Sequence, residues 1–111
     1  DYVTTLDIGP HGRYLYYIPG AHGGGQQDGT AVVQFDTKTR KKKVIAFLHP
    51  FYQKKYGYVP LGTFGSAISE NGDKLYITWN GNRGGPERRG RLAFDTCALT
   101  VIHIPESERQ P

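Results

Sequence analysis

The chain carries one pattern of residues twice, at an offset of about sixty positions. Three pairs of segments match in this way: 8–17 with 68–77, 33–37 with 92–96, and 44–47 with 101–104. A fixed offset with a constant internal order predicts a repeat architecture, in which each unit is one supersecondary structure. Repeat folds place their variable segments on one side, so the pattern also indicates where a ligand would bind.

The composition favours β-structure. The 111 residues include eight Tyr, fifteen Gly and seven Pro, and apolar residues do not recur with helical spacing. We therefore expect an all-β chain with four short antiparallel strands in each unit. The expected strands cover 4–8, 13–18, 30–35 and 42–48 in the first unit, and 63–69, 74–79, 91–94 and 99–104 in the second. A short helical turn is expected near 52–55.

Two turn-plus-strand segments carry a family resemblance. Gly-Pro-His-Gly-Arg-Tyr-Leu-Tyr at 9–16 and Glu-Asn-Gly-Asp-Lys-Leu-Tyr-Ile at 70–77 resemble the WD40-like repeats of TolB-type β-propellers, in which a Ser-Pro-Asp-Gly-Lys-like turn precedes an aromatic strand. The resemblance implies two four-stranded antiparallel propeller blades at 1–48 and 63–104, joined by an inter-blade connection at 49–62. The segment 105–111 is polar, so we expect a tail that frays. The chain departs from the pattern where the usual Asp of the turn is His11 or Asn71.

Two blades do not close a propeller, which needs roughly four to eight. The expected partners are therefore the remainder of a parent propeller or other copies of this chain. The lack of methionine and the start within an expected strand favour a C-terminal fragment of a longer polypeptide. Assembly from several copies would resemble the two-blade lectins that trimerise. An open sheet or a sandwich without a ring is the third reading.

The long segments of both units are expected at one end of the sheets. Strand order places 19–29, 49–62 and 80–89 together, and it places the short turns at 9–12, 36–41, 70–73 and 95–98 at the opposite end. Expanded loops on a rigid scaffold commonly carry binding residues. We expect a protein, peptide or glycan ligand at the long-segment end.

The candidate ligand-binding residues belong to these three segments, except Trp79, which directly precedes the third. They are His22, Gln26, Asp28, His49, Tyr52, Trp79, Asn80, Asn82, Arg83, Arg88 and Arg89. Arginine binds carboxylate or phosphate through paired N–H groups, so an anionic or sugar-like ligand is one interpretation and a solvated basic loop is the other. The aromatic residues after His49 either form a wall for a ligand or pack the connection onto the sheet. A metal site needs three or four ligands, so we predict no metal, no cofactor and no catalytic residue.

These features favour a non-catalytic binding or scaffolding module. The alternatives are the propeller portion of a larger enzyme with a site at the same end, and a self-assembling two-blade lectin. A net charge of +4 without interleaved aromatic and basic residues gives no specific nucleic-acid signal. No apolar run approaches the ~18 residues of a membrane span. By resemblance to TolB-type propellers, the expected location is extracytoplasmic, either periplasmic or secreted.

Overall fold

The computed structural model describes residues 3–19, 31–85 and 87–111. Within this part of the chain, seven strands form two antiparallel sheets. The first sheet contains, in order, β1 (Val3–Ile8), β2 (Tyr14–Pro19), β3 (Ala31–Asp36) and β4 (Lys41–Phe47). The second sheet contains β5 (Val59–Ile68), β6 (Lys74–Asn82) and β7 (Thr96–His103). The helical elements are α1 (Leu48–Tyr56), η1 (Pro10–Gly12), η3 (Gly90–Phe94) and η4 (Glu106–Glu108). The chain is therefore mostly β, as expected, but α1 and the 3-10 turns show that it is not all-β.

The first hairpins of the two sheets have the same register. Ile8 pairs with Leu15 between β1 and β2, and Ile68 pairs with Leu75 between β5 and β6. In both turns a backbone amide donates across the neck of the hairpin at 2.9 Å. The paired positions differ by sixty residues in each strand, so this part of the sequence repeat is also a repeat in the structure.

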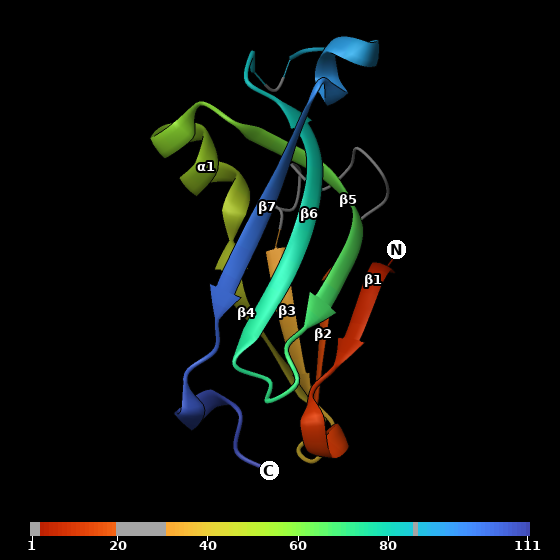
Figure 1. Cartoon of the computed structure of the whole chain (residues 1–111), viewed down its shortest axis with the longest axis vertical. Coiled ribbons are helices and arrows are strands. Elements are labelled where there is room, and N and C mark those ends of the chain that lie inside the picture. The colour runs from red at the N-terminus through yellow and green to blue at the C-terminus, as the bar shows by residue number, and fades with distance from the viewer. Residues whose placement is uncertain (1–2, 20–30, 86) are drawn as a thin grey trace.

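The core lies between the two sheets, which stack face to face (Figure 1). Strand alternation decides which side chains enter it, because successive residues of a strand point to opposite faces. Tyr16 and Ile77 are 1% and 0% exposed, whereas Leu15 and Tyr76 beside them are half-buried. The main cluster contains Tyr14, Tyr16, Ile18, Val32, Leu48, Tyr58, Leu75, Ile77, Trp79 and Ile104. Each fully buried large apolar side chain contributes about 1.5–3 kcal/mol to stability.

The connection between the sheets contains α1. Its predicted helical turn at 52–55 is confirmed, and the helix is longer, Leu48–Tyr56. Gly57 ends it with a positive φ of 64°, and the Gly57 amide donates to the carbonyl of Gln53 at 3.0 Å. Lys54 and Lys55 in the last turn suit the negative end of the helix dipole. In the described chain no helix has the length and apolar character needed to cross a membrane.

The strand predicted at 91–94 is wrong, because this segment is the 3-10 turn η3. Gly90 enters it with a φ of 61°, outside the strand region, and the Asn82 side chain donates to the carbonyl of Ala93 at 3.1 Å. Ala93 is buried against Val59 and Leu61 in a second small cluster. The described second sheet therefore has three strands, and the turn predicted at 95–98 lies at the long-segment end, where β7 begins.

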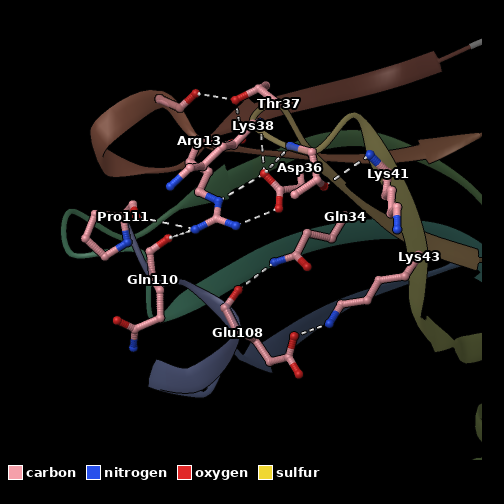
Figure 2. A network of polar contacts seen from close by, with 12 residues as sticks. Arg13, Gln34, Asp36, Thr37, Lys38, Lys41, Lys43, Glu108, Gln110 and Pro111 are labelled. Atoms are coloured by element: carbon pink, nitrogen blue, oxygen red, sulfur yellow. Dashed lines mark hydrogen bonds and ion pairs between the residues drawn. The ribbon is translucent and has the colours of Figure 1, made fainter.

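The tail after β7 does not fray in the structure. The Gln34 side-chain amide donates to the carbonyl of Glu108 at 2.9 Å, and Lys43 forms an ion pair with the Glu108 carboxylate. Figure 2 shows these contacts beside those of Arg13 with Gln110 and Pro111. The end of the second unit is therefore attached to the first sheet. The expectation of a frayed tail failed because it considered polarity alone and not the polar groups of β3 and β4.

Candidate functional site: the α1–β7 groove

The long-segment end of the sheets carries α1 and the loop from β6 to β7 (Figure 1). The turns between β1 and β2, between β3 and β4, and between β5 and β6 lie at the other end, together with the tail. The grouping of 49–62 and 80–89 at one end agrees with the strand order. His22, Gln26 and Asp28 lie outside the described residues.

A groove opens at this end between α1, the start of β7 and the residue after β6. Its volume is about 630 Å³. It is lined by Tyr52, Lys55, Tyr56, Tyr58, Arg83, Ala98 and Leu99, and we call it the α1–β7 groove. Two of the predicted residues, Tyr52 and Arg83, meet in it. They lie 31 positions apart in the sequence, and the hairpin β5–β6 brings them together.

The rear wall of the groove is held by a hydrogen-bonded set of three side chains. The hydroxyl groups of Tyr52 and Thr100 lie 2.6 Å apart, and Nε1 of Trp79 donates to the same Thr100 Oγ1 at 2.8 Å. Trp79 is only 2% exposed. The indole predicted to face a ligand thus supports Tyr52 from behind, and its polar N–H is satisfied inside the protein.

Tyr58 forms another fixed part of the groove. Its hydroxyl donates to the carbonyl of Thr96 at 2.8 Å and so links the end of α1 to the start of β7. Burial, aided by the nearby Cys97 and Asp95, raises the pKa of Tyr58 to about 12. Tyr58 is uncharged at neutral pH, as an ordinary tyrosine is, and the raised pKa extends the neutral form further into the alkaline range.

The charge of the groove comes from Lys55 and Arg83. Lys55 Nζ lies 5.3 Å from the ring centroid of Tyr56 and 5.4 Å from that of Phe51, which are cation–π distances. Arg83 is exposed. The lining residues include these two cations and no carboxylate. The groove is therefore electrostatically suited to an anionic group placed beside aromatic rings.

Asn82 and Asn80 have structural surroundings. Asn82 is fully buried, and its side-chain oxygen accepts from the amides of Gly84 and Gly85, both at 2.8 Å. This side chain shapes the loop that carries Arg83. Asn80 is half-buried, pairs with Cys97 across β6 and β7, and its Oδ1 has no hydrogen-bond partner among the described residues.

Arg88 and Arg89 lie on the exposed loop outside the groove lining. Arg88 approaches Asp95 at 3.9 Å, a distance at which an exposed ion pair contributes little. Arg89 Nη1 donates to the carbonyls of Glu87 and Arg88 at 2.7 and 3.2 Å. These contacts within the loop match the alternative reading, a solvated basic loop.

His49 lies near the start of α1 and is half-buried. Burial lowers the pKa of its imidazole, which favours the neutral form. Its buried Nε2 has no hydrogen-bond partner in the described part of the chain. His49 does not line the groove.

The candidate set drawn from the sequence omitted Lys55, Ala98 and Leu99, and it considered Tyr56 and Tyr58 only as part of the aromatic segment after His49. The signal for Lys55 was its place within the aromatic segment 51–58, because α1 brings Lys55 beside Phe51 and Tyr56. Leu99 had no such signal, because β7 was expected to begin there. Among the described residues, no group of three or more His, Cys, Asp or Glu side chains is placed to hold a metal ion.

Comparisons of this chain with protein-family models, with curated proteins and with solved structures found no match.

Proposed function

We propose that this chain is a non-catalytic binding module of the β-propeller type, and that its α1–β7 groove binds an acidic segment of a partner protein. The observation that carries the proposal is the lining of the groove. It combines Lys55 and Arg83 with three tyrosines and contains no carboxylate. Such a surface attracts an anion by charge and offers aromatic area for the residues beside it.

Three features support a propeller arrangement of the two sheets. The first sheet has the simple order β1-β2-β3-β4, the sheets stack face to face, and β1 lies beside β5. Radial repetition of blades would place equivalent strands of neighbouring blades side by side in this way. On this proposal the groove lies at the end of the blades that carries the long segments.

The hydrogen bonding of the tyrosines favours a peptide over a glycan. A sugar ligand needs polar groups that are free to bond its hydroxyls. The hydroxyls of Tyr52 and Tyr58 already bond Thr100 and Thr96 inside the protein. What the groove offers is ring faces, the 62% exposed Leu99 and two cations, which suits an acidic peptide with an apolar or aromatic neighbour.

The proposal is tested by fluorescence anisotropy with a labelled peptide that contains Glu, Asp and Phe, next to a Gln/Asn version of it. We expect salt-sensitive binding of the acidic peptide only. The double variant Lys55→Gln/Arg83→Gln should weaken it about tenfold, which is ~1.4 kcal/mol. The matched control Lys38→Gln/Lys42→Gln removes the same charge at the other end of the sheets and should leave binding unchanged. Equal losses in both variants, or binding of an acidic oligosaccharide instead, would overturn the proposal.

A further inference from the structure

The outer face of the first sheet carries a cluster of apolar side chains on β1, β2 and β3, with Lys42 of β4 beside it. Residues opposite one another in an antiparallel pair point to the same side, so Leu6, Ile8, Leu15, Tyr17 and Phe35 share the side that faces away from the second sheet. We call these five residues the front face. Leu6 is 61% and Ile8 is 55% exposed, and the other three are half-buried.

The corresponding face of the second unit is covered by the first sheet. The counterparts of Leu15 and Tyr17, sixty positions later, are Leu75 and Ile77. These two are 1% and 0% exposed, because they pack against the first sheet. The same repeat positions are therefore fully buried by a neighbouring sheet in the second unit and only half-buried in the first.

A complementary surface lies on the outer side of the second sheet. The side chains that cover Leu75 and Ile77 include Tyr16 of β2. The repeat counterpart of Tyr16 is Tyr76, which is half-buried and points outward. Tyr76 pairs with Ala67 of β5 and with Val101 of β7, so all three share the outer side. Ala67 is exposed and Val101 is 40% exposed. We call Ala67, Tyr76 and Val101 the back face.

One contact between the two sheets shows how the faces match. Within the chain, the Ser66 hydroxyl donates to the carboxylate of Asp7. The repeat counterpart of Ser66 is Leu6 on the front face, and the counterpart of Asp7 is Ala67 on the back face. The polar pair Ser66–Asp7 between the two sheets thus corresponds to the apolar pair Leu6–Ala67 on the two outer faces. The outer faces are therefore as compatible in polarity as the two inner faces.

We propose that the front face of one copy of this chain binds the back face of a second copy, in the same orientation in which the second sheet packs on the first. The contact is head-to-tail, so each copy uses two different surfaces and the assembly grows until it closes into a ring. Since propellers contain roughly four to eight sheets, two to four copies would complete one. The inference rests on the repeat, the register and the propeller arrangement proposed above, and it is independent of what the groove binds.

Native mass spectrometry and sedimentation of the 111-residue chain test this proposal. We expect one discrete oligomer that dissociates on dilution. Leu6→Asp on the front face and Val101→Asp on the back face should each give monomers. A mixture of the two variants should form a one-to-one dimer, because each supplies the face that the other has lost. Leu92→Asp, at a 59% exposed position on η3, is the control and should assemble normally.

The result that overturns the proposal is a wild-type chain that stays monomeric at the highest concentration reached. In that case the front face of one copy does not bind the back face of another. Two other outcomes would indicate a symmetric contact and would also overturn the proposal. One is that only one of the two variants loses assembly, and the other is that the mixture of the two variants stays monomeric. Circular dichroism and Trp79 fluorescence establish that each variant is folded. If one does not fold, the concentration dependence of the wild-type mass decides.

Discussion

Arg13 and Asp36 form a two-point ion pair that joins the start of β2 to the end of β3. Nε donates to Oδ1 at 3.0 Å and Nη2 to Oδ2 at 2.8 Å (Figure 2). The remaining Nη1 donates to the carbonyls of Gln110 and Pro111 at 3.1 and 3.3 Å. One guanidinium group therefore connects two strands of the first sheet to the tail of the second unit.

We predict that Arg13→Lys lowers Tm by a few degrees, although it keeps the charge. A lysine ammonium is a point charge and cannot make the paired contact with Asp36 while also bonding the tail carbonyls. The tail should become sensitive to limited proteolysis. Arg91→Lys, at an exposed position on η3, is the control and should change neither Tm nor proteolysis. If both variants behave alike, the contact has no structural importance.

The same pair predicts the acid sensitivity of the fold. The hydrogen bonds from Arg13 hold the pKa of Asp36 well below its usual range. The unfolded chain therefore takes up this proton first, so the stabilisation is present above the ordinary pKa of 3.8 and is lost as pH falls below it. We expect Asp36→Asn to flatten the fall in urea midpoint between about pH 5 and pH 2. The hydrogen bond from Ser69 also lowers the pKa of Asp73. Asp73 should therefore maintain part of the dependence of the urea midpoint on pH in the Asp36→Asn variant. An unchanged slope in Asp36→Asn would contradict the prediction.

His49 predicts a second pH effect in a separate window. Its pKa in the folded chain lies below the ordinary 6.5, so the unfolded chain binds more protons as pH falls through that value. Stability from the neutral imidazole is therefore complete above pH 6.5 and declines below it. His49→Gln should remove this decline in a series of Tm measurements. His103→Gln, at an exposed position on β7, should leave it in place.

Thr100 bonds Tyr52 and Trp79 at once, so its hydroxyl should matter more than its methyl group. We predict that Thr100→Val lowers the free energy of unfolding by about 1–3 kcal/mol, because it leaves the buried indole N–H of Trp79 without an acceptor. Thr100→Ser keeps the hydroxyl and should cost less. Urea unfolding followed by the fluorescence of the single tryptophan measures both variants. A larger loss in Thr100→Ser would show that packing, and not the hydrogen bond, dominates at this position.

Gly81 of β6 lies directly beside the backbone of β5. A Cβ atom there would lie 2.0 Å from the carbonyl oxygen of Val59, so the backbones would have to separate. We predict that Gly81→Ala destabilises the protein by at least about 1–3 kcal/mol. Gly65→Ala, in the same strand pair, places its Cβ 3.5 Å from Thr78 and serves as the matched control, with little expected loss. Equal urea midpoints for the two variants would mean that the strands adjust freely.

The sequence predicted the hairpins best, because the sixty-residue offset fixes both their turns and their registers. Ile8 with Leu15 and Ile68 with Leu75 pair as the repeat requires. The segment 91–94 was misread because its apolar residues suit a strand equally well. The side-chain bond from Asn82 to Ala93, which holds it as a 3-10 turn, joins positions that no local pattern connects.

The sequence predicted where the candidate site lies, but it did not predict which residues line it. Loop lengths indicated which end carries the long segments, but they did not distinguish Arg83, which lines the groove, from Arg88, which faces Asp95. Trp79 was misassigned for a similar reason. An aromatic residue at the end of a strand looks exposed from local sequence, and only the packing of β6 against the first sheet shows that it is buried.

The attachment of the tail to β3 has a consequence for how the molecule unfolds. Chain order runs from the first sheet through α1 to the second sheet and then back to Gln34 and Arg13. The second sheet is therefore tethered at both of its ends to the first, and neither sheet can open without disrupting the contacts of the other. Cooperativity of this kind makes the two repeats a single unit of folding, so a calorimetric scan should show one transition and not two.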